Sequence, residues 1–138
     1  MSKYSIILEE LQKGGATRRP RVEHEAMEQE TLFSWAEHMQ HIYPCLALLH
    51  HIPNGGYRNT AEAARLKRQG VKPGVPDICL PVARGAFHGL YIELKAEGGT
   101  ASKKQKEWIE ALRKEGYAAY ICEGWIEAKT KIENYINT

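Results

Sequence analysis

Two short motifs in the second half of the chain bring together residue types that can hold a metal ion and activate water. The first is Pro76-Asp77 and the second is the triplet Glu93-Leu94-Lys95. Side chains alternate along an extended strand, so Glu93 and Lys95 share one face and Leu94 points to the other. The triplet therefore predicts a carboxylate and an ammonium group side by side.

Asp77 opens a second expected strand next to this triplet. The segments 77–82 and 90–95 are apolar, and the connection 83–89 contains two glycines, a pattern typical of a hairpin. In an antiparallel hairpin the carboxylate of Asp77 approaches that of Glu93 at a strand end. Two converging carboxylates predict a site for a divalent cation.

The chemistry that suits such a site is hydrolysis of a phosphodiester. Hard cations such as Mg²⁺ prefer oxygen ligands, here carboxylates, waters, a phosphate oxygen and the backbone carbonyl of Leu94. The reaction needs an activated water, a Lewis acid and a donor for the developing negative charge. Asp77, Glu93 and Lys95 cover these needs. The alternative is a structural ion pair between Glu93 and Lys95 on an ordinary strand.

The order of the surrounding elements predicts an α/β protein. Helices are expected where apolar residues recur at helical spacing, and strands where short apolar runs end at turn residues. The expected helices cover residues 23–40, 61–69, 103–115 and 125–136. The expected strands cover residues 45–52, 77–82, 90–95 and 117–122.

Two of these helices carry end signals. Thr60 is the expected N-cap of the second helix, and Gly70 can end it in a left-handed conformation. Ser102-Lys103-Lys104-Gln105 matches a capping box at the start of the third helix, and Gly116 supplies its end. In a capping box Gln105 bonds the backbone of Ser102, which gives this glutamine a structural role.

The bulk composition is that of one globular domain. The chain has 138 residues, 43% of them hydrophobic and 26% charged, and no apolar run approaches the ~20 residues that span a bilayer. It lacks a secretory signal, and its three cysteines stand in apolar runs where free thiols pack well. These features predict a cytoplasmic protein without a membrane segment.

The net charge of +2 is too small to indicate a polyanionic partner by itself. Basic residues nevertheless gather within 18–21, 65–72 and 103–106, where each cluster can contact phosphates or form a solvated face. The candidate nucleic-acid contacts are Lys67, Lys72, Lys103 and Asn54. Asn54 is included because its glycine-rich turn can present backbone donors to a phosphate.

Together these motifs resemble the PD-(D/E)XK nuclease superfamily, and more closely its virus-type replication-repair nuclease (VRR-NUC) family. The closer likeness lies in residues 52–56 (IPNGG), 70–80 (GVKPGVPDICL) and 89–95 (GLYIELK), and in the helix with Gln105 and Trp108. It implies a restriction-endonuclease-like α/β core, a central mixed sheet flanked by helices. The nuclease domain would span residues 22–138, after an N-terminal arm over 1–21.

The resemblance implies a role for each site residue. Asp77 and Glu93 would bind Mg²⁺ or Mn²⁺, and Lys95 would orient or activate the water. Gln105 would support the active-site face, a role that competes with helix capping. A glutamate of the first helix usually completes such sites.

Two glutamates compete for that last position. Glu25 is favoured because residues 25–29 match the family's Glu-x-x-x-Gln opening. Glu28 shares a helical stripe with Leu32, so spacing alone does not choose between them. Both remain candidates.

The resemblance also implies a substrate and a partner. The family's members are metal-dependent DNA endonucleases selective for branched structures, and stand-alone members are typically homodimers that cleave four-way (Holliday) junctions. Two other readings stay open: a catalytically silent module that binds nucleic acid, and an RNA-directed hydrolase. Metal and phosphate chemistry do not distinguish the sugars, whereas intact Asp77, Glu93 and Lys95 argue against the silent module.

Overall fold

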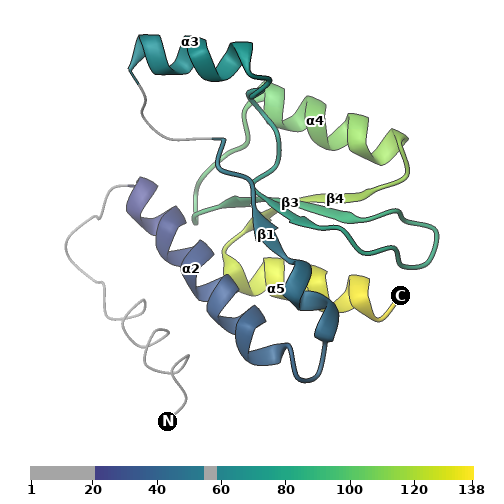
Figure 1. Cartoon of the computed structure of the whole chain (residues 1–138). Helices are drawn as coiled ribbons and strands as arrows, with labels where there is room; N and C mark the ends of the chain where they lie inside the picture. Colours follow the sequence, from purple (N-terminus) through teal and green to yellow (C-terminus); the bar gives the residue numbers. More distant parts are fainter. Residues whose placement is uncertain (1–20, 55–58) are drawn as a thin grey trace.

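A four-stranded mixed sheet organises the protein in the computed structural model, which describes residues 21–54 and 59–138 (Figure 1). The strands are β1 (His50–His51), β2 (Ile78–Leu80), β3 (Leu90–Lys95) and β4 (Ala118–Glu123), which lie in that order across the sheet. The first three are antiparallel neighbours, and β4 runs parallel to β3. This is the expected hairpin within the expected mixed sheet.

Helices cover both faces of this sheet (Figure 1). They are α2 (Arg21–Met39), α3 (Thr60–Arg68), α4 (Lys103–Lys114) and α5 (Trp125–Ile136), with a 3₁₀ helix, η1, over Pro44–Leu48. α2 and α5 lie on one face, and α4 lies on the other with α3 beyond it. The α/β fold class is confirmed. Over 21–54 and 59–138 no helix combines the length and hydropathy needed to cross a bilayer.

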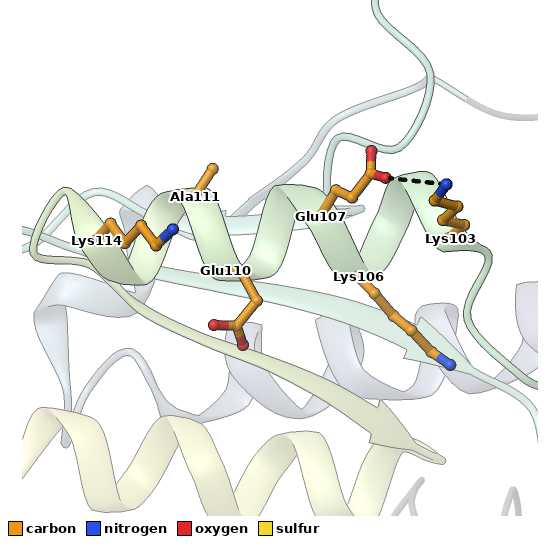
Figure 2. A pocket seen from close by; sticks show the side chains of 6 residues that line it. All are labelled: Lys103, Lys106, Glu107, Glu110, Ala111 and Lys114. Atoms are coloured by element: carbon orange, nitrogen blue, oxygen red, sulfur yellow. Dashed lines mark ion pairs between the residues drawn. The ribbon is translucent and has the colours of Figure 1, made fainter.

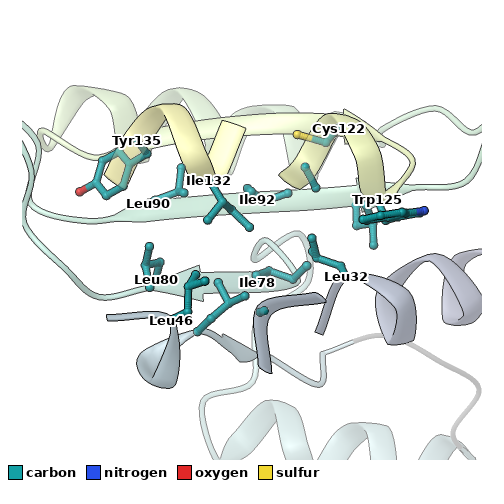
Figure 3. Packing of buried hydrophobic residues seen from close by; sticks show 14 of the residues in the cluster. Leu32, Leu46, Ile78, Leu80, Leu90, Ile92, Cys122, Trp125, Ile132 and Tyr135 are labelled. Carbon is teal, nitrogen blue, oxygen red and sulfur yellow. The ribbon is translucent and has the colours of Figure 1, made fainter. Parts of the chain in front are cut away.

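The hydrophobic core lies between the sheet and the pair α2 and α5 (Figure 3). From β3, the alternate residues Leu90, Ile92 and Leu94 are buried in it. Burial of one such side chain contributes roughly 1.5–3 kcal/mol. The alternation predicted for β3 is therefore confirmed, and it leaves Glu93 and Lys95 on the face covered by α4.

The expected strand over 45–52 is largely wrong. Its first part is η1, and only His50–His51 pair as a strand. Pro44 suits the first turn of a helix because its missing N–H needs no partner there. The buried Leu46 and Leu49 are three residues apart, which matches a 3₁₀ turn, and the Leu49 N–H bonds the Leu46 carbonyl.

The expected ends of α3 are half right. Asn59, and not Thr60, is the N-cap, since its side chain accepts a bond of 2.7 Å from the Glu62 N–H. Asparagine is at least as good a cap as threonine. Gly70 follows the helix with a φ of 100°, as expected. The other helices match their expected ranges within about two residues, and most of the expected arm 1–21 lies outside the described residues.

The segment that leads from α3 to Asp77 rests on the first turn of α4. Gly74 has a φ of 92°, and a Cβ there would lie 2.8 Å from the carbonyl carbon and oxygen of Lys104. No side chain fits such a gap. The close approach fixes the position of Asp77 relative to α4.

We predict that Gly74→Ala destabilises the protein much more than Gly98→Ala. Both glycines have a positive φ, so both substitutions introduce backbone strain, but nothing lies within 4 Å of a Cβ at Gly98. The added clash with Lys104 should cost about 1–3 kcal/mol, or roughly 3–10 °C in the thermal midpoint of a domain of this size. Thermal denaturation of the two variants measures the difference, and equal midpoints would contradict the packing described.

Candidate active site

Glu93 is a carboxylate with three donors around it and only 2% of its surface exposed. Its Oε2 accepts a bond of 3.2 Å from the Asp77 N–H. Its Oε1 accepts a bond of 2.7 Å from Gln105 Nε2 and lies 3.3 Å from Lys95 Nζ. The strand β3, the start of β2 and the helix α4 therefore meet at one side chain.

Asp77 lies opposite Glu93 at the open end of the hairpin. The register of β2 and β3 pairs Ile78 with Ile92, which brings the preceding residue, Asp77, level with Glu93. The Leu94 N–H donates a bond of 3.0 Å to Asp77 Oδ2. Each carboxylate thus accepts a backbone bond from the strand of the other, and the two converge as the hairpin predicts.

Gln105 makes a contact of each of the two kinds that the sequence left as alternatives, a helix cap and a bond to Glu93. Its Oε1 accepts a bond of 2.8 Å from the Ser102 N–H, while the Ser102 hydroxyl accepts a bond of 3.2 Å from the Gln105 N–H. The Nε2 of the same amide donates to Glu93. A side-chain amide has a separate acceptor and donor, so one residue caps α4 and binds the site.

The two glutamates of α2 have different surroundings. Glu28 Oε2 accepts a bond of 2.6 Å from the Trp125 N–H, at the first residue of α5. This contact satisfies a free N–H at a helix start, where negative charge is favoured. Burial is the largest cause of the raised pKa of Asp77, and the charge of Glu25 makes a smaller contribution in the same direction. Of the two, Glu25 is the one whose charge acts on the carboxylate pair.

Burial disfavours negative charge on both carboxyls, and the charge of Asp77 disfavours it further on Glu93. Burial and the charge of Asp77 raise the pKa of Glu93 from 4.5 to about 7, against the opposing effects of Lys95 and the Asp77 N–H. Burial also raises the pKa of Asp77, against the Leu94 N–H, Lys95 and His51. A cation bound between them would relieve this repulsion.

This donor set fits a magnesium-type ion. Such ions commonly use one or two carboxylates, and waters and substrate phosphates fill the other positions. Asp77 and Glu93 supply two carboxylates in one place. No larger cluster of three or more histidines, cysteines, aspartates or glutamates that could hold a metal exists in the described part of the chain.

His51 is a neighbour of the site that sequence reasoning missed. Its Nδ1 lies 2.9 Å from the Asp77 carbonyl oxygen, which also accepts from the Ile52 N–H. A carbonyl only accepts, so Nδ1 carries the proton and Nε2 is left with its lone pair in the neutral ring. Spacing along the chain does not indicate this contact, because the contact depends on the pairing of His51 with Ile78.

The predicted nucleic-acid contacts come from separate segments of the chain. The Asn54 side chain donates a bond of 3.1 Å to the Val75 carbonyl, so it braces the segment before Asp77; its neighbours Gly55 and Gly56 lie outside the described residues. Lys67 and Lys72 are exposed on and after α3. Lys103 is exposed at the start of α4, 4.0 Å from Glu107, beside a shallow pocket along the helix (Figure 2).

We predict that the metal-free protein loses stability as the pH rises from about 4.5 to about 7. The unfolded chain releases the proton of Glu93 near 4.5, whereas its raised pKa lets the folded state hold it until about 7. The folded state then binds more protons over this window, so the free energy of unfolding falls and levels off above it.

The variant Asp77→Asn should flatten this fall, because it removes the charge that repels Glu93 and keeps an acceptor for the Leu94 N–H. Thermal denaturation in EDTA between pH 4 and 9 measures both proteins. Parallel pH profiles for wild type and Asp77→Asn would contradict the repulsion.

Comparisons with known proteins identify the family that shares this arrangement. The VRR-NUC domain model matches residues 17–125. A solved structure described as a VRR_NUC domain protein is 38% identical in sequence, with a TM-score of 0.72; the match covers 83% of this chain and 88% of that chain. A search of the curated proteins found no match. This chain belongs to the VRR-NUC family, whose domain is a nuclease of the PD-(D/E)XK type.

Proposed function

We propose that this protein is a Mg²⁺- or Mn²⁺-dependent endonuclease that hydrolyses phosphodiester bonds in branched DNA such as four-way junctions. The observation that supports this best is the convergence of Asp77 and Glu93 at the open end of one hairpin, with Lys95 and Gln105 bound to Glu93. Family membership makes the chain a nuclease. The metal, the branched substrate and the catalytic residues are the further content of the proposal.

Asp77 and Glu93, with the backbone carbonyl of Leu94, are the proposed metal ligands. Glu25 forms no metal-binding cluster with them in the described residues, and it is proposed to join them when the ion binds. Bound there, the cation supplies a Lewis acid for the scissile phosphate. Asp77 is held in place by the Leu94 N–H, which leaves its Oδ1 for a ligand. Gln105 fixes the rotation of the Glu93 carboxylate from the opposite side.

Lys95 is the proposed group that orients the attacking water and moves a proton. Its Nζ lies 3.3 Å from Glu93, and 13% of its side chain is exposed, so it reaches both the carboxylate and solvent. An ammonium there also stabilises negative charge that develops on the phosphate oxygens. Mutagenesis of such groups typically costs 10²–10⁴ in rate, as an order-of-magnitude guide.

The proposed assembly is a homodimer of nuclease domains that span residues 22–138. A two-fold axis would place two such sites symmetrically, which suits paired incisions in a four-way junction. Family resemblance supports this assembly.

The test of the function is cleavage of labelled four-way junction, flap, duplex and RNA substrates with Mg²⁺, Mn²⁺ or EDTA. We expect metal-dependent cutting of branched DNA, and a loss of about 100-fold or more in Lys95→Ala. Lys114→Ala, an exposed lysine at the end of α4, is the matched control and should retain wild-type activity.

Cutting that survives in EDTA or in Lys95→Ala would contradict the proposed mechanism. Tight binding of junctions without cleavage would favour the silent module instead. Cutting confined to RNA would replace the DNA substrate by RNA.

We predict opposite effects for substitutions at the two glutamates of α2. Glu25→Gln should lower activity about 10-fold or more and weaken metal binding, with little change in thermal stability. Glu28→Ala removes the bond to the Trp125 N–H and should cost about 1 kcal/mol of stability while activity at low temperature stays near wild type. Calorimetric titration with Mn²⁺ and thermal denaturation measure both variants. The reverse pattern would make Glu28 the metal ligand.

A further inference from the structure

α3 is the least supported element of the fold. None of its nine residues is buried, and only Leu66 is partly shielded. Within residues 21–54 and 59–138, no other element packs extensively against it. Figure 1 shows α3 standing away from the body of the protein, on the side of the sheet that α4 covers. Residues 21–54 and 59–138 therefore provide no hydrophobic surface that explains this helix.

Local interactions alone stabilise a helix of this length poorly. Isolated helices shorter than about 12 residues are marginal in water. The Asn59 cap contributes about 1 kcal/mol, and Gly70 ends the helix without strain at a φ of 100°. These caps define where α3 begins and ends, but they do not replace packing. A binding partner would supply the contacts that the caps do not provide.

The charge of α3 indicates the chemistry of that partner. Its last turn carries Arg65, Lys67 and Arg68, and Lys72 follows the helix, whereas Glu62 is its one acidic residue. Few large apolar side chains accompany these charges, so a hydrophobic partner would bury little area. A second copy of the same basic turn would be repelled. A polyanion matches the surface.

The position of α3 links it to the carboxylate pair. The chain runs from α3 through Gly74, which touches the backbone of Lys104, to Asp77. Lys72 and the first turn of α4 therefore lie between α3 and the carboxylate pair. Both α3 and α4 lie on the face of the sheet to which Glu93 points.

We propose that α3 is a docking arm that binds the phosphate backbone of the nucleic-acid substrate at a distance from the bond that is cut. Arg65 and Arg68 bind phosphates, and substrate binding stabilises the helix. This proposal depends on the proposed nuclease function, since it assigns a further contact to the same substrate. In this proposal α3 holds the nucleic-acid strand outside the catalytic centre.

The first test compares Arg65→Gln/Arg68→Gln with Lys114→Gln/Lys129→Gln, which removes the same charge from α4 and α5. Binding to labelled four-way junction is measured in EDTA from 0.05 to 0.3 M salt. Each lost phosphate contact lowers the slope of log Kd against log salt by about 0.9, so the α3 variant should lose about 1.8. It should bind about tenfold more weakly near 0.15 M salt, and the control should match wild type.

The second test is hydrogen exchange of the amides within residues 63–69 of the wild-type protein. Junction DNA in EDTA should slow their exchange, and the double variant in α3 should lose this protection. If exchange of these amides instead slows with rising protein concentration in the absence of DNA, α3 forms a contact between copies of the protein and the proposal for α3 is wrong.

The outcomes separate the arm from the catalytic proposal. If the wild-type protein cuts junctions and the α3 variant keeps the wild-type salt slope, the proposal for α3 is wrong and the nuclease proposal stands. Wild type that neither binds nor cuts any nucleic acid would overturn both proposals.

Discussion

The buried carboxylate of Glu93 is the interaction on which the site depends. Burial of a charge is costly unless hydrogen bonds and opposite charge offset it. Here the donors come from three elements: the Asp77 N–H before β2, Lys95 on β3 and Gln105 on α4. Because the same carboxylate needs all three, its burial aligns the hairpin with the helix. The described residues contain no buried side-chain nitrogen or oxygen without a hydrogen-bond partner.

This arrangement costs stability at the place where we propose that the metal binds. Burial raises the pKa of both carboxyls, and the charge of Asp77 raises that of Glu93 further. A fold selected for stability alone would place an apolar or amide side chain at one of these positions. The hydrophobic face of β3, packed on α2 and α5, supplies the rigidity that keeps the pair in place. The exposed basic helix α3 fits the same view, since the proposed nucleic-acid partner would stabilise it.

Much of this could be predicted from the sequence because local rules govern it. Strand alternation places Glu93 and Lys95 on one face, the hairpin brings Asp77 beside them, and the capping box starts α4 at Ser102. These features depend on neighbours in the chain or on one short connection. The mixed sheet and the family follow from the same motifs.

The remaining features depend on tertiary contacts that spacing does not encode. Glu25 and Glu28 are three residues apart on one helix, and they differ in tertiary contacts: Glu28 binds the start of α5, whereas the charge of Glu25 acts on Asp77. Helix capping and contact with the site are alternatives for Gln105 in the sequence. In the structure both occur, because the Oε1 and Nε2 atoms of its amide have separate partners. His51 contacts Asp77, 26 residues away in the chain, through strand pairing. The apolar run that was expected to be a strand instead begins with η1, because Pro44 favours the first turn of a helix.

The most direct test of this account is a carbon-13 NMR titration of the Glu93 carboxyl, with and without Mg²⁺. In EDTA the pKa of Glu93 should be about 7. Saturating Mg²⁺ should move it far below that value, because the cation competes with the proton for the same oxygens. A pKa near the ordinary 4.5, unchanged by Mg²⁺ and by Asp77→Asn, would contradict a repelling carboxylate pair that binds the metal.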